Sequence, residues 1–338
     1  MRFELGKTVG DYEFLDVLDA SQGGRAYKVK NVLAQRIERL KVFPKELQDD
    51  RERVDRFLRE IKIQASLVHP NIITFYNATQ VEGQLVMTTE LLDGATLDER
   101  LETGPLPWPE AVGYIRQALS ALAYAHEQGV VHRMISPANM TVTPEKVLKL
   151  TGFDLAKATT DPQLTRAGMV MAPGLGSLEY ISPEQVKGSS DLDARTDLYS
   201  LGAVFYALVT GKPPFAFPSQ FEVMLAHVNQ TSAPPSEKLP GLPPELDPLI
   251  LKALAKDPAQ RFQSAKEFRD ALETLSVVPQ QEAPLVPRLV EMPKPVPVEP
   301  VPWLQSLPQL PPNLIALGLF TFLIVAVAFF SFLKLSRL

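Results

Sequence analysis

Cysteine is absent from this sequence, histidine is scarce, and there is no surplus of basic residues. Without cysteine, the chain has no disulfide scaffold, no zinc–cysteine site and no cysteine nucleophile. The four histidines do not stand at ligand spacing with carboxylates, so no zinc or non-haem iron site is expected. Lys and Arg total 34 against 39 Asp and Glu, which gives a formal net charge of −5. That balance argues against nucleic acid as a partner bound through a basic face.

Proline is the residue in excess, with 31 copies where average usage would give about 17. Eleven of them lie in residues 279–312. Such a segment cannot form a helix and carries too few large apolar groups to pack. Residues 279–313 are therefore predicted to be a disordered, extended, proline-rich linker. A docking site for a proline-binding module is the alternative interpretation.

Residues 314–333, with the sequence LIALGLFTFLIVAVAFFSFL, carry no charged side chain. A helix of about 20 residues spans about 30 Å, the thickness of the hydrocarbon core of a bilayer. The segment is apolar all round, as a surface helix would not be, and behind a disordered linker it has no domain in which to be buried. We therefore expect a single transmembrane helix in the lipid bilayer, followed by a short basic tail at residues 334–338.

The N-terminal residues contain no long apolar stretch, so no secretory signal is expected. Counted alone, Lys334 and Arg337 favour a cytoplasmic C-terminus under the positive-inside rule. A large domain without a signal is nevertheless not expected to be exported. The predicted topology is a cytoplasmic domain held at the cell membrane by a single-pass C-terminal anchor.

The residues before the linker divide into a strand-rich part and a helical part. The first 90 residues contain β-type runs and one amphipathic helix, and beyond residue 95 the apolar residues recur mostly with a helical period. The expected strands are residues 12–18, 25–31, 37–43, 72–78 and 84–90, and the expected helices are residues 50–67, 109–128, 194–210 and 246–255. The pattern predicts an α+β fold of two lobes.

The sequence VHRMISPAN at residues 131–139 resembles the catalytic loop of protein kinases. Further motifs of that family follow in the expected order: LKV at 40–42, RE at 59–60, HPNI at 69–72, YAH at 124–126, SPE at 182–184, DLYSLG at 197–202 and KDPAQRF at 256–262. Over residues 11–275 the chain is similar to the eukaryotic-like Ser/Thr protein kinases of bacteria. The resemblance implies a bilobal protein-kinase-like fold, with a small β-rich N-lobe and a larger helical C-lobe, in addition to the transmembrane helix.

The resemblance carries over positions that bind nucleotide. Lys41 matches the lysine that holds the α and β phosphates of ATP, and Glu60 matches the helix glutamate that pairs with it. The segment that contains Glu90 and Leu92 matches the stretch between the lobes whose backbone binds adenine. A Lys41–Glu60 ion pair is therefore expected, and ATP is the implied nucleotide.

Other matches concern the metal, the phosphates and the frame. Gly24 stands at the third glycine of the glycine-rich loop, and Asn139 stands where the family has a magnesium ligand. Glu184 and Arg261 match an ion pair of the helical lobe, and Asp197 matches a helix residue that binds the catalytic-loop backbone. These last three support the fold whether or not the chain is catalytic, and Mg²⁺ is the metal that the resemblance implies.

Three positions of the catalytic centre depart from the family's pattern, and all three act on one reaction. Met134 stands where the family has the catalytic aspartate, and a thioether bears no charge and is a weak acceptor. Ser136 replaces the loop lysine that approaches the transferred phosphate. Gly152 replaces the aspartate that holds the metal between the β and γ phosphates. No catalytic residue of the family is therefore intact.

Two neighbouring features weaken nucleotide and metal binding further. Asp154 lies two residues beyond Gly152, about 6.6 Å along an extended segment, whereas a metal–oxygen contact spans about 2.1 Å. A substitute ligand at Asp154 is therefore disfavoured. Asp19 and Ser21 take the first two glycine positions of the loop, and Asp19 adds negative charge near a triphosphate. ATP binding is expected to be weak.

Together the losses predict a membrane-anchored pseudokinase that acts as a scaffold or regulator in Ser/Thr kinase signalling, with cytoplasmic proteins or other kinases as partners. The alternative is an active, atypical ATP-dependent Ser/Thr kinase that relies on Lys41, Glu60 and Asn139.

Residues 155–181 correspond to the activation loop of the family. An ordinary polar loop is the interpretation favoured there. The alternative is that another kinase phosphorylates Thr165 and that Arg133 pairs with that phosphate.

Overall fold

A computed structural model describes residues 3–21, 24–153, 156–158, 178–273 and 275 of the chain. The predicted linker, transmembrane helix and basic tail lie outside these residues, as do Asp154 and Thr165. Within the described ranges, no helix is both long enough and apolar enough to cross a membrane. The account below concerns the compact unit that ends at Val278.

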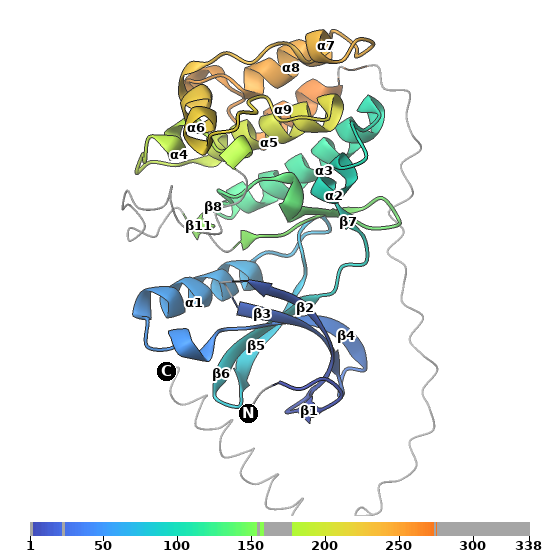
Figure 1. Ribbon diagram of the computed structural model, residues 1–338, viewed down its shortest axis with the longest axis vertical. Coiled ribbons are helices and arrows are strands. Elements are labelled where there is room, and N and C mark those ends of the chain that lie inside the picture. The colour runs from blue at the N-terminus through green and yellow to red at the C-terminus, as the bar shows by residue number, and fades with distance from the viewer. Residues whose placement is uncertain (1–2, 22–23, 154–155, 159–177, 274, 276–338) are drawn as a thin grey trace, which may run out of the picture. The chain divides into compact units, whose positions relative to one another are not determined.

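The N-terminal lobe is built on one antiparallel sheet of six strands in the order β1-β2-β3-β4-β6-β5 (Figure 1). Apolar residues on one face of the strands, among them Phe14, Val29 and Leu40, form a core with the neighbouring strands. The elements of this lobe are β1 (Thr8–Val9), β2 (Tyr12–Ser21), β3 (Gly24–Asn31), β4 (Arg36–Val42), η1 (Lys45–Leu47), α1 (Arg51–Ser66), β5 (Phe75–Val81) and β6 (Gln84–Glu90).

Helix α1 packs against the sheet through residues at helical spacing. Asp50 caps its N-terminus by accepting a hydrogen bond from the Arg53 amide. Phe57, Glu60 and Ile63 are buried on one face, and the Phe57 ring lies 5.2 Å from that of Phe43. The apolar period of α1 therefore turns Glu60 toward the sheet, because residues three apart share a helix face.

The C-terminal lobe surrounds one nearly buried helix, α5 (Ala194–Thr210), in which Thr196 to Val209 are all buried. Gly211 ends this helix in the left-handed conformation, with φ of +80°. The other helices are α2 (Leu97–Leu101), α3 (Trp108–Glu127), α4 (Pro183–Val186), α6 (Gln220–Asn229), α7 (Pro235–Lys238), α8 (Leu246–Ala253) and α9 (Ala265–Glu273). Short strands and turns complete the lobe: β7 (Ala95–Thr96), β8 (Val130–Val131), η2 (Pro137–Asn139), β9 (Met140–Val142), β10 (Leu148–Leu150), β11 (Lys157–Ala158), η5 (Leu178–Tyr180) and η6 (Pro258–Gln260).

The two lobes are joined by buried hydrogen bonds as well as by the chain between them. The Asn71 side chain donates to the carbonyl of Leu148 at 2.9 Å, and the Leu150 amide donates to the carbonyl of Asn71 at 2.8 Å. Glu90 at the end of β6 pairs with Lys149 in β10 at 2.8 Å. The end of the N-lobe sheet is thereby tied to β10.

The bilobal α+β fold expected from the sequence is confirmed, with one local error. The strand expected at residues 72–78 begins only at Phe75, because Ile72 forms a bridge with Leu150 and the Ile73 amide donates to the Leu150 carbonyl. An apolar run cannot distinguish a strand of the sheet from a segment that joins two lobes, since both are buried. The other expected elements agree with the structure to within a few residues at each end.

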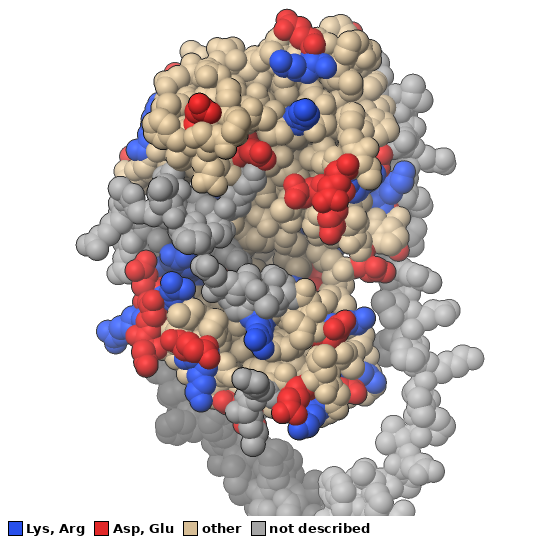
Figure 2. Space-filling view, in the orientation of Figure 1, with Lys and Arg blue, Asp and Glu red and all other residues tan. Residues whose placement is uncertain are grey.

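Charged side chains are unevenly distributed over the face seen in Figure 2. Acidic and basic groups are mixed on the strand-rich lobe, whereas larger uncharged areas separate them on the helical lobe. The strand-rich lobe therefore presents charges of both signs close together on this face.

Candidate functional site

Lys41 and Glu60 form the expected ion pair in the N-lobe. Strand β4 carries Lys41 and helix α1 carries Glu60, and the Lys41 Nζ lies 2.9 Å and 3.0 Å from the two carboxylate oxygens. The two side chains are only 11 % and 5 % exposed. A buried pair holds its geometry because separating the charges would leave both without compensation. Phosphate binding by Lys41 remains a prediction.

The catalytic loop is held by Asp197 from the buried helix α5. Its carboxylate accepts hydrogen bonds from the backbone amides of His132 at 2.8 Å and Arg133 at 2.7 Å, and the His126 Nε2 lies 2.8 Å away. Burial alone would raise the pKa of Asp197, but the His126 hydrogen bond and the adjacent groups outweigh it and lower that pKa. The frame of the loop is therefore intact.

Met134 occupies the position of the missing catalytic carboxylate. Its amide donates to the His132 Nδ1 at 3.2 Å, and its carbonyl accepts from the Asn139 Nδ2 at 2.8 Å. The His132 Nε2 lies 2.8 Å from the carbonyl of Thr151, which can only accept, so this nitrogen carries the proton. The backbone thus keeps the conformation of the loop, while the side chain at 134 offers no charge or proton acceptor for a hydroxyl substrate.

Gly152 and Asn139 are packed against each other without room for a side chain at 152. Gly152 has φ of +79°, and a Cβ placed on it would lie 2.6 Å from the Cγ and Oδ1 of Asn139. The described residues therefore do not fit a magnesium ion. Next to Asn139, position 152 has backbone atoms only, whereas the ion would need a carboxylate ligand there. Nor do the described ranges contain a group of three His, Asp or Glu side chains arranged to hold a metal.

Ser136 lies buried in the catalytic loop, with 3 % of its surface exposed. Among the described residues its hydroxyl has no hydrogen-bond partner. The Arg133 Nε is likewise buried without a partner in the described part of the chain, and burial lowers the pKa of this guanidinium. Neither Ser136 nor Met134 supplies the positive or negative charge that phosphoryl transfer needs at these positions.

The segment predicted to bind adenine begins at Glu90, the last residue of β6. The Glu90 side chain accepts from the Thr74 amide at 2.6 Å and pairs with Lys149, while the Glu90 amide donates to the Thr74 carbonyl at 2.9 Å. Leu92 is partly buried beyond it. The Glu90 side chain is therefore committed to joining the lobes, and adenine binding by this backbone remains a prediction.

The predicted glycine-rich loop joins β2 to β3. Ser21 and Gly24 are paired in register at the end of this hairpin, and Asp19 is paired with Ala26. Residues 22 and 23 lie outside the described ranges. Gly24 is thus placed at the start of β3, and its predicted contact with phosphate remains untested.

One buried cluster was not anticipated from the sequence. His227 in α6 lies between the Tyr199 hydroxyl, 2.9 Å from its Nδ1, and the Glu179 carbonyl, 3.1 Å from its Nε2. Burial, followed by the nearby Lys256, lowers the pKa of His227 to about 4. A histidine within the apolar pattern of residues 220–229 was the available signal, but its partners come from distant parts of the chain.

A model of the protein kinase domain matches residues 12–272. The chain belongs to the protein kinase family. It is 36 % identical over 281 residues to the serine/threonine-protein kinase PknB of Mycobacterium leprae, which covers 81 % of this chain and 44 % of the relative. It is 37 % identical over 273 residues to PknJ of Mycobacterium bovis, which covers 79 % of this chain and 45 % of that protein. The chain therefore spans less than half the length of these curated relatives.

Solved structures support the same assignment. The kinase domain of PknI from Mycobacterium tuberculosis superposes with a TM-score of 0.62 at 28 % identity, covering 80 % of this chain and 98 % of that one. The relatives support membership of the eukaryotic-like Ser/Thr kinases that the motifs indicated. The kinase family generally uses ATP and Mg²⁺. Lys41 and Glu60 agree with the family's nucleotide positions, whereas the packing of Asn139 against Gly152 does not fit the metal.

Proposed function

We propose that this chain is a membrane-anchored pseudokinase that acts as a scaffold or regulator in Ser/Thr kinase signalling. The observation that carries the proposal is the packing of the Asn139 side chain against Gly152, which fills the space of the absent metal-binding side chain. Met134 and Ser136 add the loss of the proton acceptor and of a cation. Three changes in one reaction centre point to loss of phosphoryl transfer, because that reaction depends almost wholly on positioned charge.

The intact frame supports a role as a binding module. Asp197 holds the catalytic loop, and Glu184 pairs with Arg261 through two contacts of 2.7 Å and 2.8 Å. The phosphates of ATP would contact Lys41, which Glu60 orients. The adenine would bind to the backbone at Glu90 and Leu92. Such a nucleotide would bind without a well-held metal and would serve to stabilise the fold rather than to be consumed.

The test uses the full chain purified in detergent and titrated with ATP, with and without Mg²⁺, followed by radiolabelled ATP to detect autophosphorylation. We expect no phosphate incorporation, and any thermal shift with ATP to be small and independent of Mg²⁺. Lys41→Ala, prepared in the same way, controls for contaminating kinases. Magnesium-dependent autophosphorylation that is lost in Lys41→Ala contradicts the proposal.

An active, atypical Ser/Thr kinase is the second candidate, and the buried Lys41–Glu60 pair at 2.9 Å is the observation that favours it. In that case Asp154 would replace the missing metal ligand. Magnesium-dependent turnover that disappears in both Lys41→Ala and Asp154→Ala supports this candidate. Turnover that is unchanged in Asp154→Ala excludes its proposed metal ligand.

The membrane anchor is a separate part of the proposal and rests on the uncharged residues 314–333. The full chain should resist extraction from membranes by alkaline carbonate, whereas a chain truncated before residue 314 should be extracted. Protease added to intact cells should leave the kinase-like domain uncut if it is cytoplasmic. Extraction of the full chain by carbonate would contradict the anchor without affecting the pseudokinase assignment.

A further inference from the structure

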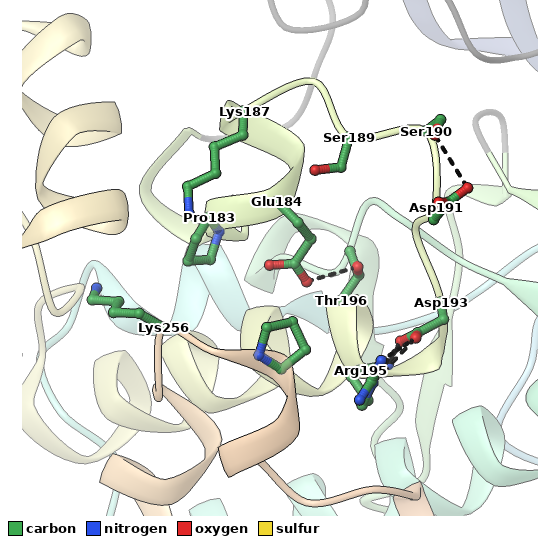
Figure 3. A pocket seen from close by; sticks show the side chains of 11 residues that line it. Pro183, Glu184, Lys187, Ser189, Ser190, Asp191, Asp193, Arg195, Thr196 and Lys256 are labelled. Atoms are coloured by element: carbon green, nitrogen blue, oxygen red, sulfur yellow. Dashed lines mark hydrogen bonds and ion pairs between the residues drawn. The ribbon is translucent and has the colours of Figure 1, made fainter.

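A pocket of about 410 Å³ opens on the helical lobe (Figure 3). Three basic and three acidic side chains line it, so their formal charges cancel. Figure 3 shows Arg195 held by Asp193 at 2.7 Å, and Thr196 donating a hydrogen bond to Glu184 at 2.8 Å. This pocket therefore favours no charged ligand of one sign. A cation without a carboxylate partner lies instead in the strand-rich lobe, at Arg39 of strand β4.

Arg39 lies on the face of the sheet that carries Lys41. Successive side chains of a strand point to opposite faces. Leu40 belongs to the apolar core on one face, whereas Lys41 pairs with Glu60 of helix α1 on the other. Arg39 precedes Leu40 and stands two residues before Lys41, so its side chain projects from the Lys41 face.

The register of the sheet places Arg39 beside the segment predicted to bind adenine. Arg39 is paired with Thr89 of β6, and Glu90 is the next residue along β6. Neighbouring strands lie about 4.8 Å apart and residues rise about 3.3 Å along a strand, so the backbones of Arg39 and Glu90 are about 6 Å apart. The side chain of Arg39 therefore begins between Lys41, the predicted phosphate contact, and Glu90, where the predicted adenine segment begins.

The surroundings direct the Arg39 side chain toward β6. Lys28 stands directly opposite Arg39 on β3, and Lys41 follows it on the same face of β4. Like charges at opposed positions of a sheet repel each other. On the other side Thr89 contributes only a short side chain, which is 1 % exposed. The guanidinium is therefore repelled from β3 and from Lys41, and the side of Thr89 and Glu90 remains open to it.

No carboxylate of the described residues holds Arg39 elsewhere. The side chain is half-buried and forms no ion pair within the described ranges. The acidic side chains of the neighbouring strands and of α1 are committed to other cations, in the pairs Arg36–Glu38, Lys41–Glu60 and Lys149–Glu90. Arg39 is therefore available to fill the space beside the adenine segment.

We infer that Arg39 limits nucleotide binding, because its side chain occupies the position that a base would take beside Glu90. A base could enter only by displacing this side chain, which costs rotamer freedom and rearranges its solvation. A phosphate chain without a base needs only Lys41 and avoids that cost. The inference rests on the proposed nucleotide site at Lys41, Glu90 and Leu92, and it names the residue that determines which ligands this site admits.

The test measures the affinities of adenosine, ATP and tripolyphosphate for the full chain in detergent, by calorimetry without Mg²⁺. In Arg39→Ala, adenosine and ATP should bind at least about tenfold more tightly than to the native chain, because the base no longer displaces a side chain. Tripolyphosphate should not gain affinity. Unchanged adenosine affinity, or a loss of ATP affinity, in Arg39→Ala overturns the inference.

Two further variants separate the bulk of the side chain from its charge. Arg39→Met keeps a long side chain without the charge, so adenosine should bind about as weakly as to the native chain. Lys62→Ala removes an exposed cation of α1 that forms no ion pair in the described part of the chain, and it is the matched control. Adenosine binding in Arg39→Met that is as tight as in Arg39→Ala, or an equal gain in Lys62→Ala, overturns the role given to the Arg39 side chain.

Radiolabelled ATP distinguishes failure of this inference from failure of the proposed function. Met134 and Gly152 are unchanged in Arg39→Ala, so tighter ATP binding should bring no incorporation of phosphate. Autophosphorylation of the native chain would contradict the pseudokinase proposal, whereas the adenosine affinities alone decide the role of Arg39.

Discussion

The side chain of Asn139 lies where a side chain at position 152 would begin: a Cβ on Gly152 would be 2.6 Å from the Asn139 Cγ. Two positions that would share a metal are thus packed together instead. The Asn139 amide is held in this place by its hydrogen bond to the Met134 carbonyl. A side chain restored at position 152 would have to displace Asn139 before any ligand could bind.

Gly152→Ala should therefore destabilise the domain by about 2–3 kcal/mol, since it combines a positive φ with a close contact. Chemical denaturation of the full chain measures the change. Gly113→Ala in helix α3, where a Cβ meets nothing within 4 Å, should instead stabilise by about 0.5–1 kcal/mol. If the double variant Gly152→Ala/Asn139→Ala loses as much as the sum of the single variants, the contact is not the cause.

Glu184→Ala should cost about 3–5 kcal/mol of unfolding free energy, because it leaves the guanidinium of Arg261 buried without its carboxylate. Burial alone would raise the pKa of Glu184, but Arg261 outweighs it and lowers that pKa. Urea denaturation provides the measurement. Asp270→Ala, which breaks the exposed pair with Lys266, should change stability by less than about 1 kcal/mol. Equal losses in the two variants would contradict the buried pair.

Protonation of His227 should destabilise the fold at mildly acidic pH. Its pKa is about 4 in the folded chain against 6.5 as the ordinary value, so between these pH values only the unfolded state binds the proton. Stability should thus fall by up to about 3 kcal/mol as pH drops from 6.5 to 4. His227→Gln should remove this part of the pH dependence, and two parallel stability–pH curves would refute the assignment.

Asn71→Leu should cost about 2–3 kcal/mol because the change removes the donor to the Leu148 carbonyl and to the Gln117 Oε1. Hydrogen exchange should also become faster at the amide of Ile73, which donates to Leu150 beside it. Asn229→Leu on the exposed end of α6 is the control. Unchanged exchange at Ile73 would mean that Asn71 does not join the lobes.

Much of the frame could be predicted from the sequence because it depends on local pattern. The helical period of residues 50–67 predicted α1 and placed Glu60 on its buried face. The Lys41–Glu60 pair then required only that the strand carrying Lys41 lie beside this helix. The order of motifs predicted two lobes. The strand at residues 72–78 was placed too early, because an apolar run does not reveal which partner buries it.

The candidate site was predictable only in part. The replacement of carboxylates by Met134 and Gly152 is visible in the sequence, since identity at a matched position is local information. That Asn139 fills the space beside Gly152 depends on a contact between residues thirteen positions apart and on a positive φ, neither of which a pattern encodes.

The sequence by itself determined the two lobes, the retained Lys41 and Glu60, and the absence of charged side chains at positions 134, 136 and 152. Only the tertiary structure decided which charges remain uncompensated. Glu184 is neutralised by Arg261, 77 residues away, whereas Lys256 is left beside Tyr199 and Ala226. The physical reason is that charge compensation and burial are set by distance in space, and folding brings together groups that the chain keeps far apart.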